Sequence, residues 1–218
     1  MELNEKQISE MVRKVLATMS AQVPEKATDG DVPVGISNRH IHLSVDDLEA
    51  LFGKGYELTP IKELSQPGQY ACKETLTIVG PSLRPIENVR VLGPVRKTSQ
   101  VEISRTDSYI LKVKPPVRES GNIKGSAPIT VIGPKGAVTL NEGCIIANRH
   151  IHMSPSEALV FGISDGDTVT VDVLGERRTR WYDVQVRVHK DFRLEMHVDT
   201  DDANSAGIGN GFKVKIVK

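Results

Sequence analysis

The chain has 218 residues, enough for one large or two small domains, and its 28 basic residues balance 28 acidic ones. A chain with no net charge and only 4% aromatic residues lacks the basic surface and the stacking side chains typical of nucleic-acid binding. No apolar run approaches the ~20 residues of a membrane-spanning helix and no signal peptide is recognisable, so the sequence predicts a cytoplasmic protein without a membrane segment.

The first predicted element is an amphipathic helix within residues 1–19. Apolar side chains recur there at the i, i+3, i+4 and i+7 positions of a helix, namely Ile8, Met11, Val12, Val15, Leu16 and Met19. Residues 20–31 are polar, contain Pro24 and Gly30, and show no periodicity, which predicts a linker. Such a helix can pack on its own domain, pair with another subunit or dock on a separate partner, and the linker favours docking.

A seven-residue motif then occurs twice, 110 residues apart. Residues 38–44 read NRHIHLS and residues 148–154 read NRHIHMS. Each copy follows a short apolar run, so each His-x-His is expected on a strand. Each copy also precedes a helix-start signal and a glycine stop, namely Ser44 with Asp47 and Gly53 in the first copy, and Ser154 with Pro155, Glu157 and Gly162 in the second.

The spacing of the histidines in both motifs predicts metal ligands. On a strand, residues i and i+2 point to the same face about 6.5 Å apart, so the two imidazoles of a motif can converge on one ion. The alternative is a polar surface strand whose histidines have no role, and for a single copy that interpretation would be preferred. Two copies with the same flanking residues favour one metal site at His40 and His42 and another at His150 and His152.

Beyond residue 31 the sequence alternates short strands with turn residues. The predicted strands are residues 70–79, 88–92, 98–104, 129–132, 137–140, 144–147, 168–174, 181–188, 195–198 and 212–217. Besides the helices that follow the repeats, residues 106–111 and 200–205 are expected to form single helical turns. Many short strands, few helices and an internal repeat predict a mainly β protein of two related β-barrel domains with short capping helices.

The repeat also suggests where the domains divide. If the chain crosses between barrels at each His-x-His, the first barrel is discontinuous and contains residues 32–39 and 148–218, and the second contains residues 40–147. This division balances the strand content of the two halves. It places both histidine motifs at the interface between the barrels, where ligand sites commonly form.

Each histidine pair needs at least one further ligand, because a catalytic zinc typically has three protein ligands and an open position. Glu102 alternates with Val101 and Ile103, so it faces away from the apolar side of its strand. His197 alternates in the same way with its two apolar neighbours. The residues make a His-His-Glu set and a His-His-His set plausible, but they do not fix the third members. His189 is expected at a surface turn.

Three arginines have interpretations of different kinds. Arg96 follows Gly93-Pro94 and precedes a strand, which suits an anion site because the planar guanidinium matches phosphate geometry; a solvated turn charge is an equal alternative. Arg39 and Arg149, inside the repeats, are expected to pair with carboxylates or turn carbonyls. No Gly-x-Ser-x-Gly elbow or convincing Cys–His pair indicates a covalent nucleophile.

The motifs together resemble those of the PduL-type phosphotransacylases, the phosphate propanoyltransferases of bacterial microcompartments. The resemblance rests on the two NRHIH motifs, on GPVR at residues 93–96 leading to QVEIS at 100–104, and on PVRESG at 116–121. It extends over essentially the whole chain, the amphipathic N-terminus included, and the combination of motifs is specific.

The resemblance implies conversion of a short-chain acyl-CoA, propanoyl-CoA or acetyl-CoA, and phosphate to acyl phosphate and coenzyme A. It implies two zinc ions between two β-barrels, one held by His40, His42 and Glu102 and the other by His150, His152 and His197. Arg96 matches the phosphate-binding arginine and Ser120 a serine close to the site. Ser37, Lys62, Arg90 and Asn204 fall where the family contacts coenzyme A.

The resemblance also implies a location and a partner. Residues 1–19 are similar to an encapsulation peptide that binds shell or core proteins of a microcompartment, which would place the enzyme in its lumen. Neither the preferred acyl group nor the presence of a homo-oligomer follows from the sequence.

Two other classes of function fit the same residues. A zinc-dependent thioester or phosphoester hydrolase would use the same ligands with water in place of phosphate. A non-enzymatic microcompartment component with structural zinc would have closed sites of four protein ligands.

Overall fold

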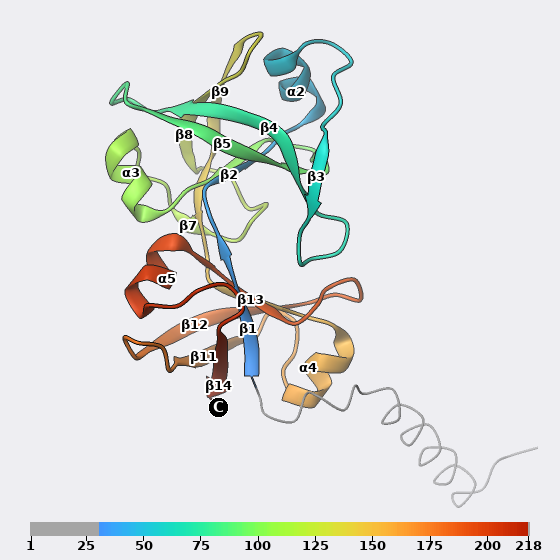
Figure 1. Cartoon of the computed structure of the whole chain (residues 1–218), viewed down its shortest axis with the longest axis vertical. Coiled ribbons are helices and arrows are strands. Elements are labelled where there is room, and N and C mark those ends of the chain that lie inside the picture. Colours follow the sequence, from blue (N-terminus) through green and yellow to red (C-terminus); the bar gives the residue numbers. More distant parts are fainter. Residues whose placement is uncertain (1–30, 218) are drawn as a thin grey trace, which may run out of the picture.

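The fold, seen in a computed structural model that describes residues 31–217, consists of two β-barrels stacked end to end (Figure 1). Each barrel is a closed ring of six strands, and four short helices lie at the ends of the strands among the described residues. The structure therefore confirms the predicted mainly β fold with two related barrels. The helix expected within residues 1–19 lies outside the described residues.

One barrel joins strands from both ends of the chain. Its strands, in order around the ring, are β1 (Asp31–Ser37), β13 (Glu195–Asp199), β10 (His150–Met153), β12 (Thr179–Val188), β11 (Thr168–Val173) and β14 (Lys213–Val217). β14 pairs antiparallel with β1 and closes the ring. The side chains inside it form a separate apolar core that includes Val34, Ile151, Trp181 and Met196.

The other barrel comes from the middle of the chain. Its ring contains β4 (Tyr70–Val79), β5 (Pro85–Gly93), β2 (His40–His42), β6 (Gln100–Glu102), β9 (Ala137–Ala147) and β8 (Ala127–Ile132). Two short strands extend it, β3 (Pro60–Glu63) beside β4 and β7 (Val117–Arg118) beside β9. The sequence predicted neither. β9 also runs unbroken where two strands were predicted, because Gly143 continues the strand at a φ of 142° that glycine tolerates.

The helices begin and end where the capping signals predicted. α2 (Val45–Phe52) and α4 (Pro155–Phe161) start at the side chains of Ser44 and Ser154 and stop at Gly53 and Gly162. α3 (Arg105–Leu111) and α5 (Thr200–Ala206) occupy the two predicted helical turns. No described helix has the length and apolar character needed to cross a membrane.

The two barrels share one strand plan, related by the repeat. β2 lies parallel to β5 and antiparallel to β6, and β10 lies in the same way between β12 and β13. The chain leaves β1 in one barrel and enters β2 in the other, and it returns when β9 leads to β10 (Figure 1). Both His-x-His motifs therefore begin where the chain crosses from one barrel to the other.

The arginine of the repeat pairs with an aspartate of a helix in both halves, which confirms the predicted pairing with carboxylates. Arg39 donates from Nε and Nη2 to the two carboxylate oxygens of Asp107 on α3, over 2.9 and 2.7 Å. Arg149 Nε lies 3.3 Å from a carboxylate oxygen of Asp202 on α5. Each ion pair ties the residue before a histidine motif to a helix of the barrel that the chain is entering.

The two aspartates are expected to differ in what they contribute to stability. Asp107 is 1% exposed and also accepts from the backbone of Ser104, so Asp107→Asn should lower the free energy of unfolding by about 2–4 kcal/mol. Burial raises the pKa of Asp202 to about 6 against the opposing effect of Arg149. Because that folded-state pKa exceeds the ordinary value, ionised Asp202 costs stability as the pH rises from about 4 to 6.

Asp202→Asn should therefore change the free energy of unfolding at pH 7 by less than about 1 kcal/mol. Relative to the wild type, the variant should become more stable as the pH rises. Urea unfolding of both variants at pH 4.5 and pH 7 measures the contrast. Equal losses for the two variants at pH 7 would contradict it.

Candidate metal centres and their shared cleft

The first cluster is formed by two neighbouring strands of one barrel. β2 and β6 pair antiparallel so that His40 is opposite Glu102, and all three residues of the set, His40, His42 and Glu102, are buried. Their ligand atoms lie within 4.8 Å of one another, and His40 Nε2 is 3.4 Å from Glu102 Oε2. The structure thus brings Glu102, one of the two proposed third members, to its histidine pair.

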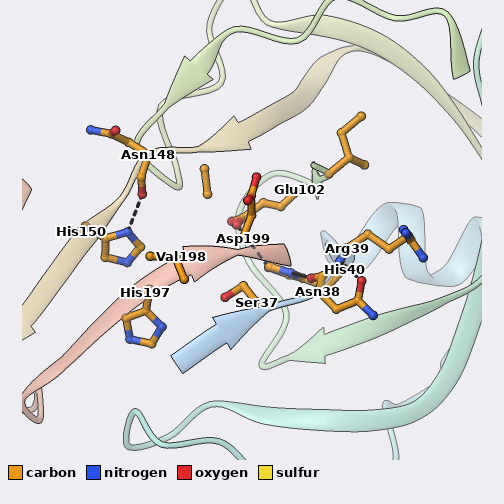
Figure 2. A pocket seen from close by; sticks show the side chains of 12 residues that line it. Ser37, Asn38, Arg39, His40, Glu102, Asn148, His150, His197, Val198 and Asp199 are labelled. Carbon is orange, nitrogen blue, oxygen red and sulfur yellow. Dashed lines mark hydrogen bonds and ion pairs between the residues drawn. The ribbon is translucent and has the colours of Figure 1, made fainter. Parts of the chain in front are cut away.

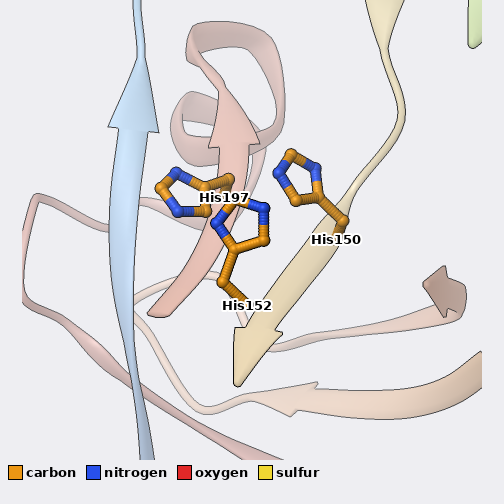
Figure 3. Close-up of side chains that lie close together, drawn as sticks. All are labelled: His150, His152 and His197. Atoms are coloured by element: carbon orange, nitrogen blue, oxygen red, sulfur yellow. The ribbon is translucent and has the colours of Figure 1, made fainter. Parts of the chain in front are cut away.

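The second cluster is formed by the equivalent strands of the other barrel. β10 and β13 pair so that His150 is opposite His197 (Figure 3), just as His40 is opposite Glu102 in the first cluster. The ligand atoms of His150, His152 and His197 lie within 4.8 Å of one another, and the three ring centroids are 4.7 to 5.1 Å apart. His197 and Glu102 therefore occupy equivalent positions in the two barrels.

The repeat also sets the orientation of the leading histidine in each cluster. His40 Nδ1 lies 2.8 Å from the carbonyl oxygen of Asn38, and His150 Nδ1 lies 2.8 Å from that of Asn148 (Figure 2). A carbonyl accepts only, so each Nδ1 carries the proton and donates it. Each Nε2 is then free to act as a ligand, an arrangement typical of metal-binding histidines.

The donor atoms in both clusters fit a divalent metal such as zinc. His42 Nδ1, His197 Nε2 and both ring nitrogens of His152 are buried without a hydrogen-bond partner, which is rare for buried polar atoms. Burial lowers the pKa of His42 to about 3, that of His152 to about 2 and that of His197 to about 3, so these imidazoles are neutral. Neutral imidazole is the form that binds zinc.

Glu102 supplies the negative charge of the first cluster. Burial acts to raise the pKa of its carboxyl group, but the neighbouring His40 outweighs burial and holds that pKa well below the ordinary value. The same contact raises the pKa of His40, although burial opposes it. The carboxylate therefore stays ionised, as a metal ligand must be.

The two clusters face each other across a narrow space and open into one cleft. A cavity of about 30 Å³ lies between them, with His40 and Glu102 on one side and His150 and His197 on the other (Figure 2). It adjoins a cleft of about 670 Å³ that all six cluster residues line. This cleft is large enough for part of an elongated ligand.

Most of the other residues predicted for the site also line this cleft, namely Ser37, Lys62, Arg90, Arg96 and Ser120. Asn204 does not line the cleft; it lies on α5, where its side chain is exposed. Another asparagine, Asn210, lines the cleft. Arg90 is partly engaged already, since its Nη1 donates to the carbonyl oxygens of Cys72 and Lys73 over 2.9 and 2.8 Å.

Arg96 is held beside the first cluster by a short hydrogen-bond chain. Its Nη1 donates to Ser120 Oγ over 3.1 Å, and the amide of Gln100 donates to the same oxygen over 2.9 Å and to Glu102 Oε1 over 2.6 Å. Burial lowers the pKa of Arg96, but an arginine remains charged at any ordinary pH. A fixed cation in a half-enclosed cleft is suited to bind an oxyanion.

Arg187 at the cleft and Gln100 beside Glu102 are site residues that were not predicted. Arg187 lies on β12 and pairs in register with His152, which places a further guanidinium at the cleft. Its alternation with Val186 and Val188 was the available signal, since it marks Arg187 as facing away from the apolar core. Gln100 is 1% exposed, and nothing in its strand distinguished it from an ordinary polar residue.

These features define a two-barrel protein with paired metal-type donor clusters and fixed cations at one cleft. The family model for phosphate propanoyltransferase matches residues 33–209. A phosphate propanoyltransferase of Lachnoclostridium phytofermentans is 58% identical over 215 residues, which cover 99% of this chain and 100% of the relative. One of Thermotoga maritima is 60% identical over 186 residues, covering 85% and 88%. The chain belongs to the phosphate propanoyltransferase family.

Proposed function

We propose that this protein is a zinc-dependent phosphate acyltransferase that converts a short-chain acyl-CoA and phosphate to acyl phosphate and free coenzyme A. Its relatives' name supports propanoyl-CoA as the substrate, with acetyl-CoA as a second candidate. The observation that carries the proposal is the placement of two metal-type clusters and the Arg96–Ser120 pair around one cleft.

Two zinc ions are proposed, one for each cluster. His40, His42 and Glu102 would hold one, and His150, His152 and His197 the other. Bound zinc would act as a Lewis acid toward the thioester carbonyl and would stabilise a thiolate, a soft ligand for which it has high affinity.

Arg96 would bind and orient phosphate, with Ser120 and Gln100 fixing the guanidinium. A phosphate oxygen then attacks the thioester carbon, the carbon–sulfur bond breaks, and coenzyme A leaves as the thiolate. Direct attack requires no covalent intermediate on the protein. The cysteines are poor nucleophiles, since burial raises the pKa of Cys72 to about 11 and that of Cys144 to about 12.

Coenzyme A is proposed to lie along the cleft. Lys62 and Arg90 are cations on its wall and suit the phosphates of coenzyme A, and Ser37 offers a hydroxyl beside the first cluster. The proposed contact with Asn204 would require the coenzyme to extend out of the cleft onto α5. Domain boundaries at residues 39/40 and 147/148 are proposed as well; they would place these residues on both domains.

The test is acyl-CoA turnover with and without phosphate on protein of known zinc content. Release of coenzyme A from propanoyl-CoA should require phosphate and should yield acyl phosphate in equal amount. Release at the same rate without phosphate would instead indicate the zinc-dependent hydrolase. A protein that binds zinc but catalyses neither the transfer nor the hydrolysis would be a structural component.

Residues 1–19 are proposed to bind a shell or core protein of a bacterial microcompartment and so to place the enzyme in its lumen. Deleting these residues should leave the specific activity within about twofold of the full chain, because both clusters and the cleft lie within residues 31–217. Co-purification with shells should be lost. If the shortened chain still co-purifies with shells, these residues do not direct packaging.

A further inference from the structure

Glu195 completes a four-cornered arrangement around the second cluster. β10 and β13 pair so that His150 is opposite His197 and His152 is opposite Glu195. Because residues two apart on a strand share a face, these four side chains project from one patch of the barrel into the cleft, which all four line. Glu195 has no part in the function proposed above.

The fourth corner differs in charge between the two barrels. In the first cluster the third member is the carboxylate Glu102, and the fourth corner is Gln100, whose neutral amide donates to it over 2.6 Å. In the second cluster the third member is the neutral His197, and the fourth corner is the carboxylate Glu195. Each patch therefore contains one carboxylate, but at a different place: Glu102 is opposite the first histidine of its motif, and Glu195 is opposite the second.

Glu195 is close to His197 without being its hydrogen-bond acceptor. Its Oε2 lies 3.2 Å from His197 Nε2, yet that nitrogen is buried and has no partner in hydrogen-bonding geometry. In the first cluster Glu102 Oε2 stands at a similar distance, 3.4 Å, from His40 Nε2. Both contacts thus bring a carboxylate oxygen beside an imidazole nitrogen that is available to a metal.

Space for the Glu195 carboxylate depends on a glycine. Gly35 on β1 pairs in register with His197, and a Cβ at residue 35 would lie 2.8 Å from Glu195 Cδ and 2.9 Å from its Oε1. Real Cβ atoms do not approach so closely, so any side chain at residue 35 would displace the carboxylate. The glycine therefore permits the position that Glu195 occupies.

The opposite barrel holds the carboxylate in place. Ser65, in the loop between β3 and β4, donates to Glu195 Oε2. Gln66 is 4% exposed, and its Nε2 lies 3.4 Å from the same oxygen. Gln66 is fixed in turn by Arg193, whose carbonyl accepts from Nε2 over 3.1 Å and whose amide donates to Oε1 over 3.2 Å.

A carboxylate at this point matters because the second cluster has no other negative charge among its members. Three neutral imidazoles leave the charge of a divalent cation uncompensated, and Arg187 adds a positive charge to the same part of the cleft. We propose that Glu195 is a positioning residue that stabilises a divalent cation at His150, His152 and His197 by supplying the carboxylate which that cluster lacks. This inference rests on the zinc binding proposed above.

Zinc affinity of the second cluster alone tests the proposal. In a His40→Ala background, which removes a ligand from the first cluster, zinc binding is measured by competition with a chromogenic chelator. Adding Glu195→Gln should weaken the remaining site about 10–100-fold, the usual effect of losing a residue that supports a metal ligand. Glu87→Gln, the same change at an exposed position on β5, should leave the affinity unchanged.

A second variant separates charge placement from loss of the side chain. Gly35→Ala keeps Glu195 but displaces its carboxylate, so it should also weaken zinc binding, and it should add little in the Glu195→Gln background. Glu195→Asp should recover part of the affinity. The metal-free unfolding midpoint of Glu195→Gln should match that of its parent, which a merely structural role would not allow.

The outcomes distinguish this inference from the proposed function. If the wild type binds zinc at both clusters and Glu195→Gln binds it as tightly as its parent, the role of Glu195 is wrong and the zinc enzyme stands. If the wild type binds no zinc, both are wrong.

Discussion

Replacing Arg96 by alanine is expected to raise the KM for phosphate about 100-fold or more, equivalent to about 2.7 kcal/mol of lost binding. The guanidinium is half-buried at the cleft and is held by Ser120 in a fixed direction, so phosphate would lose an oriented, charge-assisted contact. Zinc content should not change, because Arg96 belongs to neither cluster.

Two further substitutions sharpen the Arg96 experiment. Arg96→Lys keeps the charge but not the planar fork, so its KM for phosphate should lie between those of the wild type and the alanine variant. Arg84→Ala removes an exposed arginine outside the cleft and should leave the kinetics unchanged. Wild-type phosphate kinetics in the Arg96→Ala variant would show that phosphate is bound elsewhere, with Arg187 as the next candidate.

The sequence predicted a strand where one face of it is buried and missed a strand where all of its residues are exposed. β4 lies at Tyr70–Val79 as predicted, because its buried apolar residues Cys72, Leu76 and Ile78 fall on one face of a strand, at even spacing. β3 was missed because all four of its residues, Pro60–Glu63, are exposed, so no alternation marks it. β9 was divided in two because Asn141, Glu142 and Gly143 are typical of a turn, whereas the strand continues through them and pairs with β8 on both sides of a register shift, at Leu140 and at Cys144.

The candidate site was predicted as far as local pattern could reach. The histidine pairs and their two proposed third members came from period-two alternation, which marks the side of the strand that faces away from the core. The pairing that brings Glu102 to His40 joins residues far apart in sequence through strand register, which no local pattern specifies. The same holds for Glu195, whose relation to the second cluster appears only once β13 is placed beside β10.

The architecture explains why each motif both supplies histidines to a cluster and marks the crossing between the barrels. Each motif begins where the chain crosses between barrels, so its histidines stand at the mouth of the barrel they enter and face the other barrel. Arg39 and Arg149 fasten these crossings to α3 and α5. Duplication alone would give two equal clusters. The exchange of glutamate for histidine at the third position gives one cluster a carboxylate and leaves the other with imidazoles alone, so the two clusters need not have the same task.

His150→Ala is the second substitution with a large expected effect. Zinc content should fall from about two ions per chain to about one, because the second cluster would retain only two of its three imidazoles. Acyl transfer should fall at least about 100-fold, since the variant loses the ion together with the His150 that faces His40 and Glu102 across the cavity.

His189→Ala provides the matched control for His150→Ala. Its side chain is 54% exposed and belongs to neither cluster, so zinc content and activity should both remain at wild-type levels. Metal analysis after dialysis, combined with the phosphate-dependent assay, measures both quantities on the same preparation. A His150→Ala protein that retains two zinc ions would exclude His150 as a ligand, whatever happens to its activity. Loss of zinc with full activity would instead show that the second cluster takes no part in the transfer.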